Sequence, residues 1–450
     1  MRHRLALASL LALPGPACSD SEEPKPAWKP GIVYDSPGLT PRGLVDVRGL
    51  VHAHSVYSHD ACDDEPVKNG VRDPVCFDDF RRGLCQTRQD FVFLTDHPSD
   101  FAETPFTEAL LHRAERGDTY VESNGGPVAA WLACEDGHKT LVLPGTESDL
   151  MPVGLDAHIP SKSYGQRTVA GVAEMRASGA IVLKAHTEDT NPDEIIALGL
   201  DGFEMHNLHA NAIMAAGTLL ELLVLNAEKS PELPVPDLAL LPMLSEDPRY
   251  MATWGTVLSR GHRAITTMGT DCHRNSFPAL LADGERADSY RRMMMVMSNH
   301  LLVRPRSDGS FGPEELEEAL RTARAYGAFE VMGYPLGFDF HAEDGSELVE
   351  MGGEAHLGAR LVARLPSVQD LDPTQRAPEL FARILRAREG GFDEVARAQG
   401  DATFTVTSTG AYRAEVRMKP RHLERMLGRY RQDAVFTERV WVYSNPIYVK

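Results

Sequence analysis

Histidine and acidic residues follow a series of short apolar runs in the first two thirds of the chain. In chain order they are His52 and His54, Asp96 and His97, Glu147, His186, and Asp271 and His273, while His158 lies in a further Asp-Ala-His segment. In parallel α/β folds the carboxyl ends of the strands meet at one face, where active sites are built. We therefore expect these six segments to bring imidazoles and carboxylates to one site.

Imidazole and carboxylate side chains together are the ligands of zinc, manganese and iron sites, whereas calcium sites are nearly all oxygen. Alternate residues of a strand point to the same side, so His52 and His54 can share one metal ion, and Asp271 and His273 can serve one ion or two neighbouring ions. Taken singly, His-x-His is more often the polar edge of a strand, and Asp-His is more often a helix cap. Six such segments, all but that of His158 directly after an apolar run, favour a metal site.

Apolar runs that alternate with helix-forming stretches must position these residues. The runs lie at 44–51, 91–94, 140–143, 180–183, 202–205, 264–268 and 293–303, where the methionines at 293–297 are expected in a buried strand. Helices are expected at 169–178, 192–198 and 314–326. This alternation predicts a parallel α/β arrangement, either a barrel or an open sheet. Beyond about residue 333, short alternating stretches predict a small, mainly-β domain with a helical insertion at 378–398.

The motifs resemble those of the PHP family, the polymerase and histidinol phosphatase metal-dependent phosphoesterases. The first family motif, His-x-His-Ser-x-x-Ser-Asp, is similar to His52-Ala-His54-Ser-Val-Tyr-Ser-His59-Asp60 in this chain. The later motifs are similar to Thr95-Asp96-His97, Pro144-Gly-Thr-Glu147 and Gly269-Thr-Asp271-Cys-His273, with His158 and His186 between them. The resemblance covers about residues 45–330. It implies a distorted (β/α)7 TIM-like barrel with a di- or trinuclear metal site.

The resemblance also implies how two or three divalent ions of zinc, manganese or iron would be held. A first ion would take His52, His54, Glu147 and Asp271; Glu147 would bridge to a second ion on His158 and His186; and a third would take His59, His97 and His273. Many family members have Asp-Gly where this chain has His59-Asp60. Asp60 is therefore an alternative ligand to His59.

The activity implied is hydrolysis of a phosphate mono- or diester by a metal-bound hydroxide, with Glu147, Asp271 and His59 as catalytic residues. The same ions could instead hydrolyse a carbamate or a carboxylic ester, and a third alternative is a non-catalytic binding lipoprotein of the cell envelope. The expected partner is a small-molecule ester, most simply a phosphorylated one.

Several neighbouring residues have two open interpretations. Asp60 and Asp96 either orient histidines or serve in turns and caps. Lys184 and Arg274 either contact a phosphate or point away from the site. The segment Glu204-Met-His206-Asn207-Leu-His209 resembles a Glu-x-x-Asn segment of relatives and either lines the pocket or forms a structural hydrogen-bond network.

Composition and charge narrow the function classes. Apolar residues make up 42% and charged residues 25% of 450 residues, which is ordinary for globular domains and excludes collagen, coiled coil and wholesale disorder. The net charge is −19 and no dense Lys/Arg run is present, so no nucleic-acid partner is expected.

The N-terminus predicts export. Arg2 and Arg4 precede a short apolar run that ends before Cys18, which is typical of a secretory signal and resembles a lipoprotein lipobox. We expect a signal peptide at 1–18, a lipid anchor on Cys18 as the only membrane attachment, a polar tether at 19–42, the metal-dependent barrel at 43–332 and the β domain at 333–450. Without Cys18 five cysteines remain, so at most two disulfides form; 62–85 is the expected place for one.

Overall fold

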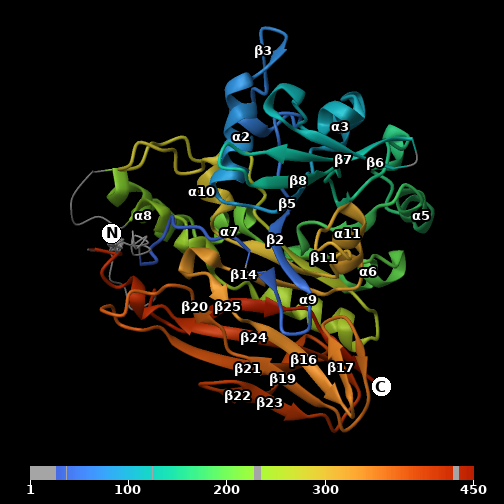
Figure 1. The fold of residues 1–450 in the computed structure, drawn as a ribbon, viewed down its shortest axis with the longest axis vertical. Helices are drawn as coiled ribbons and strands as arrows, with labels where there is room; N and C mark the ends of the chain where they lie inside the picture. The colour runs from blue at the N-terminus through green and yellow to red at the C-terminus, as the bar shows by residue number, and fades with distance from the viewer. Residues whose placement is uncertain (1–26, 37, 124, 228–234, 429–434) are drawn as a thin grey trace, which may run out of the picture.

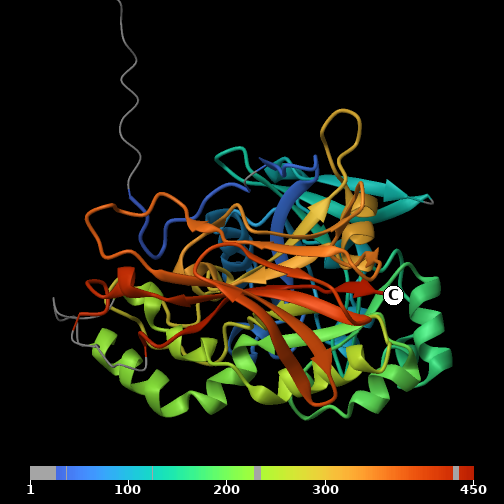
Figure 2. The same ribbon diagram turned by 90° about the horizontal axis from the view of Figure 1, so that it is seen from below.

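The computed structural model describes residues 27–36, 38–123, 125–227, 235–428 and 435–450. The signal peptide and Cys18 lie outside the described residues. The chain is a mixed α/β structure with several sheets (Figure 1). Helices from the middle of the chain line one side of the C-terminal strands, which are red in Figure 2. Within the described ranges, no helix is both long and apolar enough to cross a membrane.

Three parallel strands carry the first predicted motifs. These strands are β2 (Val45–Val51), β5 (Phe91–Phe93) and β8 (Lys139–Leu143), each close to its predicted run. Their residues are almost all buried, as expected for strands covered on both faces. β2 and β5 approach so closely at Gly49 that a Cβ there would lie 2.3 Å from the Phe91 carbonyl oxygen. The hairpin formed by β6 (Thr119–Ser123) and β7 (Gly126–Ala133) extends this sheet beyond β8 and was not predicted.

A second sheet carries the later motifs. Its order is β12 (Ile265–Gly269), β11 (Gly202–Asn207), β10 (Ile181–Lys184) and β9 (Leu150–Val153), with β9 antiparallel to β10 and the other pairs parallel. Single bridges, Ala53 with Cys272 and Gly145 with Val153, lie between the two sheets. No continuous ladder closes the strands into a barrel, so the predicted TIM-like closure is not shown among the described residues.

Most predicted helices begin and end where local capping chemistry places them. α5 (Val169–Ala177) begins after Thr168, and α6 (Pro192–Leu198) begins after Asn191 and ends at Gly199, whose φ is 63°. α11 (Pro313–Arg321) is shorter than the predicted helix over 314–326, because β14 (Ala325–Ala328) begins within that range. The methionine run does not form a strand, because it lies in α10 (Tyr290–Met294) and the turn before β13 (Ser298–Val303). Among the helices that were not predicted are α2 (Pro74–Gln86), α8 (Ala216–Ala227) and α9 (Pro248–Ser259).

Residues beyond 333 are mainly strands, and several continue the first sheet. β25 (Arg439–Ser444) pairs with β14, followed by β24 (Gly410–Lys419) and β26 (Ile447–Val449). A separate four-stranded sheet contains β17 (Glu347–Glu350), β16 (Asp339–Asp344), β19 (Arg360–Arg364) and β23 (Ala402–Thr405). The predicted helix at 378–398 is wrong: β21 (Glu379–Arg388) and β22 (Gly391–Ala398) form a hairpin there. Pairing of β21 with β24 outweighs the helix propensity of its Ala, Leu and Arg residues.

A buried charge network, which we call the seam network, lies where β2, β13 and β14 meet. The His300 ring lies between two carboxylates, with Nδ1 2.9 Å from Asp46 Oδ1 and Nε2 3.0 Å from Glu330 Oε1. Arg48 donates to Glu330 over 2.6 Å, and Tyr326 donates to Asp46 over 2.7 Å. Each member is buried. The network joins the strand of the first metal motif to the strands that lead into the C-terminal part.

The part of the predicted tether that is described packs against the fold. Trp28 is buried, donates its backbone N–H to Asp370 over 2.8 Å and contacts His422, while Arg42 pairs with Asp339 and Glu350. Two disulfides, Cys62–Cys76 and Cys85–Cys134, leave Cys272 as a buried free thiol. This agrees with the expectation of at most two disulfides and one near residues 62–85.

Candidate metal centre

The ends of β2 and β12 place the first histidines against the last motif. Two backbone hydrogen bonds join them: Asp271 N donates to the His52 carbonyl over 3.1 Å, and His54 N donates to the Cys272 carbonyl over 3.2 Å. His52, His54 and Asp271 therefore form one donor group, with ligand atoms close enough to hold a metal ion. All three side chains are buried.

The chemistry of this first group fits a cation. Nε2 of His52 and Nε2 of His54 lie 3.2 Å apart, and Asp271 Oδ1 lies 3.0 and 3.3 Å from them. Asp271 Oδ1 is buried without a hydrogen bond of good geometry among the described residues. Two facing imidazole nitrogens and an unsatisfied carboxylate oxygen are costly to bury unless a positive charge lies between them. A divalent metal ion meets that requirement.

A second group brings together His52, Glu147 and His186. Glu147 follows β8 and is nearly buried, and its Oε1 lies 3.7 Å from His186 Nε2. His186 Nε2 also lies 3.7 Å from Asp271 Oδ2, so the first and second groups adjoin. Glu147 shares the second group with His52 and its Oε2 also lies 3.2 Å from His97 Nδ1, while its bridging role stays a prediction.

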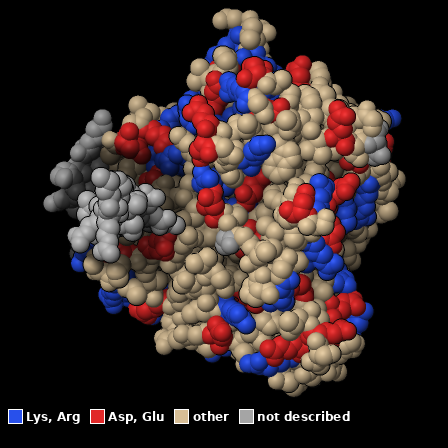
Figure 3. Space-filling view, viewed as in Figure 1, with Lys and Arg blue, Asp and Glu red and all other residues tan. Residues whose placement is uncertain are grey.

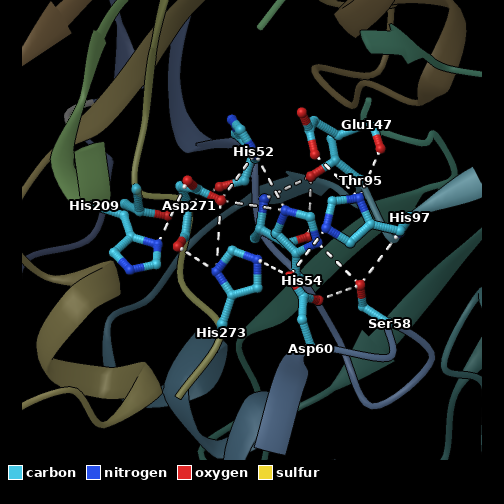
Figure 4. A network of polar contacts seen from close by, with 12 residues as sticks. His52, His54, Ser58, Asp60, Thr95, His97, Glu147, His209, Asp271 and His273 are labelled. Carbon is cyan, nitrogen blue, oxygen red and sulfur yellow. Dashed lines mark hydrogen bonds and ion pairs between the residues drawn. The ribbon is translucent and has the colours of Figure 1, made fainter. Parts of the chain in front are cut away.

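A third group contains His54, Asp60, His97 and His273 (Figure 4). Asp60 Oδ2 lies 2.9 Å from His97 Nε2 and 3.0 Å from His273 Nε2, and the rings of His54 and His273 stack at 3.9 Å. The side chain of His59 is 61% exposed and its Nδ1 contacts Asp100 at 2.8 Å. The structure thus places Asp60, the alternative ligand, in the group and leaves the predicted ligand His59 outside it.

His158 is the other predicted ligand that the structure leaves outside the donor groups. Its Nε2 lies 2.8 Å from the Thr104 carbonyl and its Nδ1 lies 3.3 Å from the Tyr164 hydroxyl. Phe101 and Phe106 contact the ring on its edges. With both nitrogens engaged by protein atoms, His158 is placed as a packing residue.

Two clusters of polar side chains form hydrogen bonds next to the donor residues. Glu204 Oε1 contacts His52 Nδ1 at 2.8 Å, and Asn207 donates to Glu204 over 3.0 Å and to Asp271 over 3.2 Å. Asp96 accepts hydrogen bonds from the backbone N–H and hydroxyl of Ser55, over 2.6 and 2.7 Å. Such contacts fix the orientation of metal ligands and raise their basicity. Glu204 and Asn207 therefore line the site and form the polar network at once, whereas Asp96 holds the backbone next to His54 and not a histidine ring.

The charges of the cluster match a site that binds cations. Burial opposes ionisation of Asp271, but His52 and His273 outweigh it and hold its pKa well below the ordinary value. Burial also opposes protonation of His97, but Asp60 and Glu147 outweigh it and raise its pKa to about 9. Burial also raises the pKa of Glu147 and lowers that of His54, whereas Asp271 is ionised and the imidazole of His97 carries both of its ring protons. A metal ion that binds here would displace one of those protons.

The backbone at the site adopts conformations that side chains usually avoid. φ is 130° at His52, 48° at His186 and 51° at Asp271. Positive φ at residues other than glycine is uncommon and gathers at functional sites, where the surrounding structure maintains it. Three of the candidate ligands share this feature, which supports a functional role for the cluster.

The two predicted phosphate contacts are engaged elsewhere, and one donor was not predicted. Lys184 Nζ pairs with Asp149 at 3.2 Å, and Arg274 Nε pairs with Asp79 at 2.8 Å. His209, at the start of α7 (Leu208–Met214), groups with Asp271 and His273. The only sequence signal for His209 was its place two residues after the Glu-x-x-Asn segment.

Comparisons with known proteins give little beyond this geometry. No family model and no curated protein matches the chain. A solved structure to which it is similar is a two-domain protein from Bacteroides vulgatus that contains a predicted PHP-like metal-dependent phosphoesterase. The two chains are 12% identical over 93% of this chain and 100% of that chain, with a TM-score of 0.31. The donor groups themselves therefore remain the basis for function.

Proposed function

We propose that the chain is a metal-dependent phosphoesterase that hydrolyses a phosphate mono- or diester of a small molecule. The observation that carries the proposal is the set of adjoining donor groups, in which His52, His54 and Asp271 are shared between neighbours. Divalent ions in such groups lower the pKa of a bound water and neutralise charge that develops on a phosphoryl group. Their charge would also attract a phosphate anion in a protein of net charge −19.

Some residues of the site would bind the ions, and others would keep those ligands in place. His52, His54 and Asp271 would hold the first ion, with Glu147 towards a second on His186, while Asp60, His97 and His273 would hold the third. Glu204 and Asn207 would keep the His52 ring and Asp271 in place. Ionised Asp271 would contribute negative charge to the cluster, which the bound ions would exceed.

A surface cavity of about 640 Å³ beside the third group is suited to the remainder of the ester. His59, Lys68, Arg72 and Asp100 are among the residues that line it. The His59 ring lies 5.0 Å from that of His97, so His59 stands between the cavity and the donors. We therefore assign His59 to substrate contact rather than to a metal ion.

The proposal is tested on residues 19–450 loaded separately with manganese and zinc. Initial rates are compared on a phosphomonoester, a phosphodiester, a carbamate and a carboxylic ester with one chromogenic leaving group. We expect turnover of a phosphate ester that is lost in His54→Ala together with bound metal. Turnover that survives complete metal loss would refute the proposal.

One observation favours a second candidate, a carbamate or carboxylic-ester hydrolase. The two cations that flank predicted ligands in the chain, Lys184 and Arg274, are each paired with a carboxylate and so form no clamp for a phosphate dianion. In the same assay, turnover of the carbamate or the carboxylic ester alone would select this candidate.

The distorted (β/α)7 barrel is part of the proposal. Seven strands, β2, β5, β8, β9, β10, β11 and β12, follow one another around the site when the two bridges between the sheets are included. Buried residues from both sheets, among them Val51, Phe93, Leu143, Met151 and Leu183, also share one cluster. A shared interior and two bridges support a closure that is only partly hydrogen-bonded.

We also propose export with a lipid anchor on Cys18. The two disulfides support an oxidising compartment, since such bonds are rare in reducing cytosol. Charges of both signs are interspersed on the face shown in Figure 3, in keeping with a small-molecule substrate rather than a nucleic acid. Labelling with a radioactive fatty acid should be lost in Cys18→Ser, and retained label would contradict the anchor.

A further inference from the structure

A disulfide lies next to the third donor group. Cys62 comes two residues after Asp60 and is bonded to Cys76 in the first turn of α2. Both cysteines are buried. The bond therefore ties the segment after a candidate ligand to a helix that carries no ligand.

The segment that the disulfide holds is left-handed. φ is 61° at Cys62, 61° at Asp63 and 60° at Asp64. L-residues avoid this region because Cβ crowds the following carbonyl, and where they enter it they do so singly. Three in succession persist only when neighbouring structure maintains them.

The same segment is joined to the last metal motif. Cys62 N donates to the His273 carbonyl over 2.9 Å, and Asp63 N donates to the Arg274 carbonyl over 3.1 Å. The Asn275 side chain donates to the Asp60 carbonyl over 2.7 Å. The left-handed turn thus sets the position of Asp60 relative to His273, whose Nε2 lies 3.0 Å from Asp60 Oδ2.

Without the disulfide, these hydrogen bonds and the ion pairs of Asp63 with Arg286 and Arg274 would still contact the turn. Arg286 donates to both oxygens of Asp63 over 2.7 Å, but the Asp63 side chain is 46% exposed. Exposed pairs contribute little to stability. The Cys62–Cys76 bond is the covalent constraint on the turn, and it adds to these non-covalent contacts.

We propose that Cys62 and Cys76 are positioning residues for the third metal: their disulfide maintains the left-handed turn that places Asp60 against His97 and His273. This inference rests on the proposed function, because it deepens the role of the same site. It assigns the Cys62–Cys76 bond a role that the Cys85–Cys134 bond, whose cysteines lie farther from any donor in the chain than Cys62 does, does not have.

The test counts Mn²⁺ ions bound per full chain by titration, with free Mn²⁺ followed by electron paramagnetic resonance. Asp60→Asn identifies the ion held by the third group. We expect Cys62→Ala/Cys76→Ala to lose that same ion, or to bind it at least about 10-fold more weakly. Adding Asp60→Asn to this double variant should remove nothing further.

Two matched variants separate positioning from general stability. Cys62→Gly/Cys76→Ala differs from the alanine variant by one Cβ, and glycine adopts φ near 60° without that cost, so the third ion should be retained. Cys85→Ala/Cys134→Ala should retain every ion. The inference is overturned if Cys62→Ala/Cys76→Ala binds all ions, if the glycine variant loses as much as the alanine variant, or if both disulfide deletions lose equally.

Failure of the proposed function gives a different result. An unchanged count in Asp60→Asn would refute the assignment of Asp60 as a ligand. A reduced count in Asp60→Asn beside a full count in Cys62→Ala/Cys76→Ala would refute only the positioning role of the disulfide.

Discussion

Replacement of His300 by glutamine should remove a defined pH dependence from the stability of the protein. His300 is fully buried in the seam network between Asp46 and Glu330. Burial opposes its protonation, but the two carboxylates outweigh burial and raise its pKa to about 9. An unfolded histidine titrates near 6.5. Between these two pH values the folded protein binds a proton that the unfolded chain has lost.

The sign and size of the change in the free energy of unfolding follow from the difference in proton binding between the folded and unfolded states. A pKa that is higher in the folded state gives stability that is complete below about pH 6.5 and lost as pH rises through about 9. A difference of about 2.5 pK units at about 1.4 kcal/mol each corresponds to about 3 kcal/mol. The free energy of unfolding of the wild type should fall by that amount, relative to His300→Gln, between pH 6.5 and 9.5.

The assay is urea unfolding at fixed pH values, with metal chelated and both disulfides intact. Other groups titrate in both proteins and cancel in the difference between them. His356→Gln is the matched control, because His356 also contacts one carboxylate, Asp344, but its side chain is 81% exposed. Its profile should follow that of the wild type. Wild-type and His300→Gln profiles that stay parallel within about 1 kcal/mol would refute the linkage argument.

Further predictions concern the metal centre and one distant carboxyl. Asp60→Asn should lower both the metal count and turnover, whereas His59→Ala should leave the metal count unchanged. Elemental analysis of the two purified variants measures the metal count. The reverse pattern would restore His59 as the ligand. Asp96→Asn should weaken metal affinity about 10- to 100-fold by releasing Ser55, as measured by competition with a chelating dye; unaltered affinity would show that Asp96 orients nothing. Chelation should abolish turnover and lower Tm, and metal at about 100 times its Kd should restore about 2.7 kcal/mol per ion; a Tm insensitive to chelation would contradict a built site. Burial and nearby Asp156 raise the pKa of Glu317 to about 8, so ionisation of this carboxyl destabilises the fold as pH rises from about 4.5 to 8. Glu317→Gln should therefore be more stable than wild type at pH 9 but not at pH 4.5. Equal stability of the two proteins in urea at both pH values would argue against this shift.

The donor groups were largely predictable because their signal is local. Each of His52, His97, Glu147, His186 and Asp271 lies just beyond an apolar run, and the run, the strand and the strand end coincide in the structure. The central strands were predictable for the same reason, since buried parallel strands are continuous apolar runs.

The choice between His59 and Asp60 could not be made from spacing. The two residues are adjacent, and which side chain enters the site depends on the left-handed turn at 62–64 and on a disulfide to Cys76. His158 was equally ambiguous, because the Thr104 carbonyl that engages it comes from a distant loop. Such partners are set by tertiary structure.

The hairpin of β21 and β22 shows that the prediction of strands is limited in the same way, by partners that are distant in the chain. Its alanine, leucine and arginine residues are good helix formers, and only the long-range partner β24 turns the segment into a strand. The extent of the first sheet was also not predictable, since β14 and β25 are more than a hundred residues apart in the chain.

The pairing of β2 with β13 has a consequence for how the protein is made. His52 and His54 leave the ribosome long before Asp271 and His273, so the first donor group does not exist until most of the chain has been synthesised. Until then β2 has neither its β13 partner nor its bridge to Cys272, and its apolar residues stay exposed. Proteins with such distant contacts fold slowly and are prone to aggregate meanwhile. An exported chain of this design would cross the membrane before it could capture a metal ion, so the compartment of destination would determine which metal it receives.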